Sequence, residues 1–160
     1  MILVKGIVDE DFVNYKKPSM FIAANSCSFK CETESGCQCC QNGDLVRAES
    51  FRIDADALVE RYLSNPITKA VVFGGLEPFD QIGELIEFLY SLREKYKCFD
   101  DVVIYTGYKK EEVSHKIWTL SAFPNIIVKF GRFIPNSEPK YDALLGVTLA
   151  SKNQYAERIS

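Results

Sequence analysis

Residues 69–92, KAVVFGGLEPFDQIGELIEFLYSL, contain the unit from which the rest of the fold can be predicted. The run that begins at Lys69 is apolar until it reaches Gly74 and Gly75, which predicts a buried strand that ends in a tight turn. The residues that follow repeat apolar side chains at helical spacing, at Ile82, Leu85, Ile86, Leu89 and Leu92. We therefore expect a strand, a glycine turn and an amphipathic helix in succession.

The same unit recurs on both sides of this stretch. Further strands are predicted at residues 20–24, 101–107, 125–131 and 143–151. Further helices are predicted at residues 109–120 and at residues 54–65, where Asp54 is the expected N-cap. Apolar strands that alternate with amphipathic helices indicate the α/β class, with a mostly parallel sheet covered by helices. The pattern is compatible with both an open barrel and a doubly wound sheet.

The length and charge of the chain limit the functions to consider. With 160 residues, 47% of them apolar, we expect one domain over residues 1–160, with an N-terminal edge strand and turn in residues 1–18. The net charge is −3 and basic residues are scattered, which argues against nucleic-acid binding. No basic leader and no bilayer-length apolar run is visible, so we expect a cytoplasmic protein without a membrane partner.

One short segment holds five of the six cysteines: residues 26–42, SCSFKCETESGCQCCQN, here called the cysteine stretch. Neighbours such as Cys39 and Cys40 rarely meet disulfide geometry, so a metal centre is favoured over a disulfide framework. Thiolates hold both zinc and iron-sulfur clusters, and spacing alone leaves both open. Cys98 lies far from the stretch and is expected to be a half-buried apolar residue, as Trp118 is expected to lie in the core.

In α/β folds, ligands bind where the carboxyl ends of the parallel strands meet. The cysteine stretch follows the predicted strand at residues 20–24. The other strand ends are marked by Gly74-Gly75, Thr106-Gly107, Gly131 and Ser151. We therefore expect all of these positions to face one rim.

The cysteine stretch resembles the cluster loop of radical S-adenosylmethionine enzymes, in which three closely spaced cysteines hold a 4Fe-4S cluster. CSFKC matches the first two cysteines, and CQN matches the third together with an asparagine typical of small activating enzymes. The resemblance assigns Cys27, Cys31 and Cys40 as the metal ligands, with Cys37 as the rival third ligand. The chain departs from the pattern because eight residues separate Cys31 from Cys40, and because Cys39 stands where an aromatic residue commonly packs near the adenine.

Four further segments extend the resemblance. FGGLEP at 73–78 is similar to the glycine-glycine-glutamate-proline turn that approaches the methionine amino group of the cofactor. YTGY, KFGRFI and LASKNQ resemble the activating enzymes of anaerobic ribonucleotide reductase, although Lys129 replaces a common acidic residue and Tyr155 a common arginine. The cofactor-binding residues that the resemblance implies are Gly74, Gly75, Leu76, Glu77, Cys39, Gln41, Thr106 and Asn153.

The resemblance implies an incomplete (β/α) barrel with mostly parallel strands and an oxidoreductase of the radical S-adenosylmethionine type. Such an enzyme uses its 4Fe-4S cluster to cleave S-adenosyl-L-methionine reductively to a 5′-deoxyadenosyl radical. The expected partners are a glycyl radical enzyme subunit, as in anaerobic ribonucleotide reductase, and an electron donor such as flavodoxin or ferredoxin. The alternatives are a related enzyme that modifies another protein, a peptide or a small molecule, and a non-enzymatic zinc or iron-sulfur module.

Overall fold

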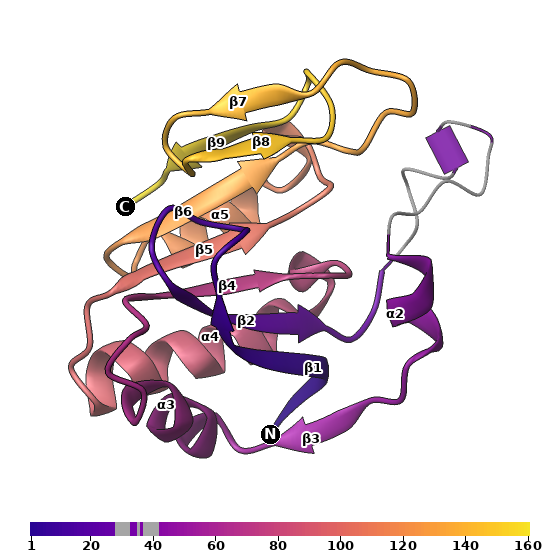
Figure 1. Ribbon diagram of the computed structural model, residues 1–160. Coiled ribbons are helices and arrows are strands. Elements are labelled where there is room, and N and C mark those ends of the chain that lie inside the picture. Colours follow the sequence, from indigo (N-terminus) through magenta and orange to yellow (C-terminus); the bar gives the residue numbers. More distant parts are fainter. Residues whose placement is uncertain (28–32, 35, 37–41) are drawn as a thin grey trace.

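The computed structural model describes residues 1–27, 33, 34, 36 and 42–160, and its centre is a seven-stranded sheet (Figure 1). The strand order is β3-β1-β2-β4-β5-β6-β9, and β7 and β8 form a separate hairpin. The strands are β1 (Ile2–Asp11), β2 (Ser19–Ala24), β3 (Phe51–Ile53), β4 (Ala70–Gly74), β5 (Asp101–Tyr105), β6 (Ile126–Phe130), β7 (Lys140–Asp142), β8 (Val147–Leu149) and β9 (Tyr155–Arg158). The helices are α2 (Gly43–Arg47), α3 (Ala55–Leu63), η1 (Pro78–Gln81), α4 (Ile82–Tyr90), the π-helical η2 (Ser91–Lys95), η3 (Lys110–Glu112) and α5 (Ser114–Leu120).

The four central strands are parallel, which confirms the predicted α/β class. β2 pairs with β4, β4 with β5 and β5 with β6 in parallel, while β1, β3 and β9 add antiparallel pairs at the two sides. The sheet is not closed into a barrel, because β3 and β9 are its two edges. The expectation that the N-terminal strand is an edge strand is wrong, since β3 pairs along the outer side of β1.

The two faces of the sheet carry separate cores. On one face, α3, α4 and α5 bury an apolar stripe against alternate residues of the central strands, as the period-two geometry of strands requires. The helical side of this core includes Leu58, Val59, Tyr62, Leu85, Phe88, Leu89 and Leu120. On the other face, Tyr15 and the β7–β8 hairpin cover Val72, Val103 and Ile127. The smaller core leaves room beside it for a pocket.

The predicted start of α3 is confirmed in detail. The Asp54 carboxylate accepts hydrogen bonds from the backbone N–H groups of Asp56 and Ala57, at 3.0 and 3.2 Å. These bonds satisfy two donors that the first turn of a helix leaves without partners.

Arg93 fastens the amino ends of β5 and β6. Its side chain is fully buried in η2, and it donates to the carbonyl oxygens of Cys98, Asp100, Pro124 and Asn125, at 2.7, 2.8, 3.0 and 3.4 Å. These carbonyls belong to the loops that lead into β5 and β6. Cys98 is half-buried against the main core, as expected. The desolvated guanidinium, whose pKa is lowered by burial, therefore ties a helix end to two strand starts.

The C-terminal quarter differs from the sequence-based expectation. The single strand predicted at residues 143–151 is instead a turn followed by β8, because Asp142 closes a tight turn that ends at Gly146. The Asp142 carboxylate accepts from the N–H of Leu145 at 2.9 Å, and Gly146 has φ of 72°. Trp118 is 74% exposed on α5, so its predicted place in the core is wrong. In the part of the chain that the structure describes, no helix is long and apolar enough to cross a membrane.

Candidate functional site

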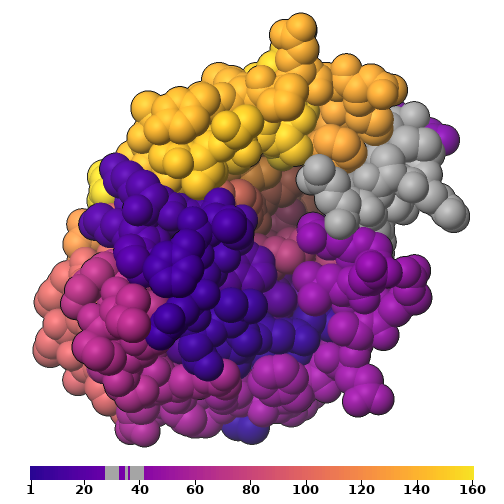
Figure 2. Space-filling model, viewed as in Figure 1, coloured from indigo at the N-terminus to yellow at the C-terminus, as the bar shows by residue number. Residues whose placement is uncertain are grey.

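A pocket of about 260 Å³ lies where the carboxyl ends of β2, β4, β5 and β6 meet. Figure 2 shows the surface hollowed between the N-terminal segment, in indigo, and the C-terminal segments, in orange and yellow. The strand ends contribute Cys27 after β2, Gly75, Leu76 and Glu77 after β4, Thr106, Gly107 and Tyr108 after β5, and Gly131, Arg132 and Phe133 after β6. The rim predicted at the ends of these four strands is therefore a real cavity, built by the parallel topology. The prediction for the fifth position, Ser151, is wrong: it is fully buried beside the pocket without lining it, and it follows β8 of the separate hairpin.

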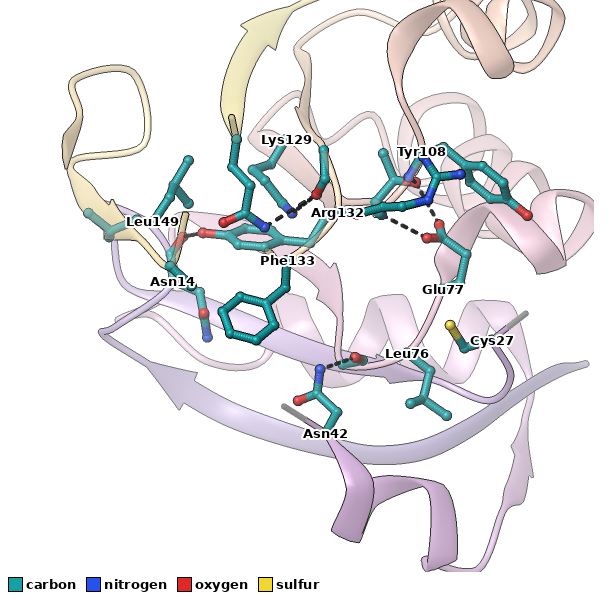
Figure 3. A pocket seen from close by; sticks show the side chains of 18 of the residues that line it. Asn14, Cys27, Asn42, Leu76, Glu77, Tyr108, Lys129, Arg132, Phe133 and Leu149 are labelled. Carbon is teal, nitrogen blue, oxygen red and sulfur yellow. Dashed lines mark hydrogen bonds between the residues drawn. The ribbon is translucent and has the colours of Figure 1, made fainter. Parts of the chain in front are cut away.

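Glu77 organises the turn after β4. Its carboxylate is buried, and it accepts hydrogen bonds from Thr106 Oγ1 at 2.8 Å, Gly107 N at 2.8 Å and Phe79 N at 3.1 Å. Burial raises the pKa of Glu77, and the three donors act against that rise. The side chain thus joins the ends of β4 and β5 (Figure 3).

Gly75 allows the chain to turn sharply at the end of β4. Its φ is 78°, and a Cβ there would lie 2.6 Å from Leu45 Cδ2 and 3.2 Å from Ala23 Cβ. Glycine alone adopts this conformation without strain and leaves room for both neighbours. The Gly75 carbonyl accepts a hydrogen bond from Asn42 Nδ2 at 2.5 Å, which brings the end of the cysteine stretch to the pocket.

Four described residues of the cysteine stretch line the pocket or contact residues of its wall. Cys27, half-buried, and Asn42 line the pocket directly. Between them, Glu34 Oε1 lies 3.4 Å from Arg132 Nε, an ionic contact rather than a hydrogen bond. In addition, the backbone N–H of Glu77 donates to the Ser26 carbonyl at 2.8 Å. The stretch therefore begins and ends at the pocket.

The predicted site residues are only partly brought together. Cys27, Gly75, Leu76, Glu77 and Thr106 all line the pocket. Residues outside the described part of the chain are the predicted ligands Cys31 and Cys40, the rival ligand Cys37, and the predicted cofactor contacts Cys39 and Gln41.

Two of the predicted residues serve the walls of the site instead of lining it. Gly74 packs against the Phe21 ring, which would lie 3.0 Å from a Cβ at this position. Asn153 is exposed, and its Nδ2 donates to the Arg132 carbonyl at 2.9 Å. Thr106 lines the pocket but is buried, and its hydroxyl is used by Glu77 and by the N–H of Tyr108, at 2.8 and 3.0 Å. These contacts hold the strand ends in place.

The structure adds two cations that the sequence analysis did not select. Arg132 is buried and makes a bidentate pair with Glu112, with both N–O distances at 2.7 Å. Lys129, the last but one residue of β6, is also buried and lines the pocket. A lysine inside an otherwise apolar strand, IIVKF, is the signal that could have identified it.

The donor set fits an iron-sulfur cluster. Cys27 places a thiol at the pocket, and the segment that carries the other four cysteines of the stretch starts and ends there. Soft thiolates from one short loop are the usual ligands of such clusters. In the described residues, Cys27 is the predicted ligand that the structure places, and it stands at the pocket rim.

Comparison with known proteins agrees with this chemistry. The model of a family described as 4Fe-4S single cluster domain matches residues 18–154. Searches of curated proteins and of solved structures gave no match. Because the family match covers most of the chain, from β2 to the residue before β9, this protein belongs to the family of 4Fe-4S single cluster domains.

Proposed function

We propose that the chain is a radical S-adenosylmethionine enzyme of the small activating type. The observation that carries the proposal is the pocket itself: Cys27, Asn42 and the Gly75–Glu77 turn line one cavity at the carboxyl ends of parallel strands. The family match supplies the iron-sulfur component. The open sheet is compatible with the incomplete barrel that we expect for this class.

In this proposal Cys27, Cys31 and Cys40 hold the 4Fe-4S cluster, with Cys37 as the alternative third ligand. When bound, the cluster and S-adenosyl-L-methionine supply the electron transfer and the 5′-deoxyadenosyl radical that no side chain can provide. The chain supplies binding and orientation. The turn at Gly75 and Leu76 lets the cofactor approach the backbone closely, and Cys39 and Gln41 contact it from the cysteine stretch.

Glu77 acts as a positioning residue in this scheme. Its two oxygens accept three hydrogen bonds from both strand ends, so it fixes the shape of the turn after β4 and the path of the chain after β5. Thr106 and Asn153 extend the same support to the ends of β5 and β6. A rigid rim of this kind keeps a bound cofactor in one orientation.

The proposed substrate is a glycyl radical enzyme subunit such as that of anaerobic ribonucleotide reductase, with flavodoxin or ferredoxin as the electron donor in the cytoplasm. The similarity of YTGY, KFGRFI and LASKNQ to the reductase activating enzymes supports this choice. It is tested separately from the chemistry, by mixing the reduced protein and S-adenosylmethionine with a reductase subunit and recording the glycyl radical by electron paramagnetic resonance. A different protein, peptide or small molecule as substrate would give cofactor cleavage without that signal.

Anaerobic reconstitution with iron and sulfide tests the chemistry. We expect a brown protein that, after reduction with dithionite, converts S-adenosylmethionine to 5′-deoxyadenosine and methionine. Cys27→Ser should lose the cluster and the cleavage, while the matched control Cys98→Ser, which changes a thiol in the main core, should keep both. A colourless protein that binds zinc and cleaves no cofactor would refute the proposal.

A further inference from the structure

The proposed function does not explain how a chain with eight residues between Cys31 and Cys40 brings both cysteines to one cluster. Glu34, one of those eight residues, makes a contact on the far side of the pocket. Its Oε1 atom lies 3.4 Å from Nε of Arg132, which follows β6. The cysteine stretch starts after β2, and β4 and β5 separate β2 from β6 in the sheet. Neighbouring strands are about 4.8 Å apart, so Glu34 lies about 14 Å across the sheet from the end of β2.

The described residues of the cysteine stretch are therefore tied to three different strand ends. Cys27 lines the pocket at the end of β2. Asn42 donates to the Gly75 carbonyl at the end of β4, at 2.5 Å. Between these two residues in the sequence, Glu34 contacts Arg132 beyond the end of β6. The contact at Glu34 lies away from both ends of the stretch, so it restrains the stretch from within.

Arg132 is a rigid anchor for this contact. Its side chain is only 5% exposed, and its two terminal nitrogens both donate to Glu112, at 2.7 Å. The guanidinium lies 5.9 Å from the ring centroid of Tyr108 (Figure 3), and the Arg132 carbonyl accepts from Asn153 Nδ2 at 2.9 Å. Because the guanidinium is already fixed, pairing with Glu34 orders only one side chain.

The third guanidinium donor of Arg132 gives Glu34 a reason to stay. The Nε atom is buried and makes no hydrogen bond among the described residues. A buried N–H group without an acceptor costs free energy, and a nearby carboxylate lowers that cost. The Glu34 side chain is 53% exposed, so water screens the pair and limits its strength.

We propose that Arg132 is a positioning residue for the metal centre, and that it acts by anchoring Glu34. The anchor divides the eight residues between Cys31 and Cys40 into two residues before Glu34 and five after it. If Cys37 is the third ligand, only two residues follow Glu34. A shorter free segment loses less entropy when its ends are brought together, so a cysteine that leaves the cluster returns faster. The inference rests on the iron-sulfur cluster and not on the chemistry of S-adenosylmethionine.

The test measures how fast the reconstituted protein loses its cluster to an iron chelator, followed by absorbance without oxygen. It compares the wild type, Glu34→Gln, Arg132→Gln and the double variant, with Glu49→Gln as the control for loss of an exposed carboxylate. Glu34→Gln should lose the cluster about two- to fivefold faster than the wild type, and high salt should reduce this difference. Adding Glu34→Gln to Arg132→Gln should change the rate no further, and Glu49→Gln should behave as the wild type does.

A wild-type rate in Glu34→Gln would overturn the inference. So would an equal acceleration by Glu34→Gln in the wild type and in Arg132→Gln, because Glu34 would then act without the arginine. If Arg132→Gln does not fold, Glu34→Lys decides: repulsion from Arg132 should speed cluster loss beyond that of Glu34→Gln, and a rate no faster refutes the anchor.

The result is separate from that of the proposed function. A protein that keeps its cluster but cleaves no S-adenosylmethionine refutes the proposed function, and the rates of cluster loss still decide the role of Arg132. If the protein holds zinc instead, the same variants are compared by release of zinc to a chelator. A wild type that takes up neither iron-sulfur nor zinc would overturn the inference, since there would be no metal centre to position.

Discussion

Replacing Lys129 by methionine should make the ligand-free protein more stable at neutral pH. The wild-type side chain keeps a positive charge in a buried wall, next to one carbonyl and one aromatic ring. Methionine has a similar length and no charge, so it removes the cost of desolvation and still fills the space.

The size of the effect follows from the pKa of Lys129. The folded protein lowers that pKa from 10.5 to about 8. Each pKa unit is worth about 1.4 kcal/mol, so holding the charge in the folded state costs about 3 kcal/mol. The variant also loses the hydrogen bond to Gly131 and the contact with Tyr105, together about 1–2 kcal/mol. The expected net gain at pH 7 is therefore about 1–2 kcal/mol.

The difference should depend on pH with a defined sign. Below pH 8 Lys129 is charged in both the folded and the unfolded state, so its full cost is present. Between pH 8 and 10.5 the unfolded chain binds more protons than the folded one, so the wild type gains stability as the pH rises. The advantage of Lys129→Met should shrink over this range. Other titrating groups are common to both proteins and cancel in the difference.

Urea unfolding followed by far-ultraviolet circular dichroism measures these stabilities, on the protein without cluster and under reducing conditions. The free energy of unfolding is compared at pH 7, 8, 9 and 10, with Lys69→Met as the control for loss of an exposed charge. A constant difference between wild type and Lys129→Met across the series would refute the reasoning. So would a variant less stable than the wild type at pH 7.

Three more substitutions test other parts of the structure. Glu77→Gln should lower stability by about 1–3 kcal/mol, because an amide cannot accept all three hydrogen bonds, including that from Gly107; an unchanged denaturation midpoint would contradict this. Gly75→Ala should lower the free energy of urea unfolding by about 1–2 kcal/mol, because the added Cβ would clash with Leu45 and alanine is strained at a φ of 78°. A variant as stable as the wild type would show that α2 moves aside without cost. Arg93→Met removes the arginine donor from four part-buried carbonyls, of which that of Asn125 keeps the bond from the Val102 N–H, and should cost about 3 kcal/mol, seen as a lower melting temperature. A melting temperature equal to that of the wild type would exclude this role.

The central strands and their helices could be predicted because their signal is local. Uninterrupted apolar runs such as Ala70–Gly74 are buried on both faces, and Asp54 marks the start of α3 by a bond within its own turn. Strands β3 and β9 were missed. Each is short and carries charged residues, so only pairing with β1 and β6 makes it a strand.

The site was predictable where a residue type has one common use, as for Cys27 or for Gly75 in a tight turn. Lys129 and Arg132 could not be assigned in the same way. The folded chain brings each cation to its partners: Gly131 for Lys129, and Glu34 and Glu112 for Arg132. Whether a cation has a carboxylate within ion-pair distance is known only from these contacts. Thr106 is the opposite case: the sequence selected it as a cofactor contact, and in the structure its hydroxyl donates a hydrogen bond to Glu77.

Arg93 allows one end of the sheet to maintain the fold while the other end varies during evolution. It secures the starts of β5 and β6, at the opposite ends of these strands from the pocket. Loops at the pocket rim can then vary in length and composition while the buried guanidinium keeps the strands in register. The long segment between Cys27 and Asn42 is the kind of insertion such a scaffold accepts. We expect this chain to keep its fold when the segment between Cys27 and Asn42 is replaced by another metal-binding loop, so that the same sheet can support a different chemistry.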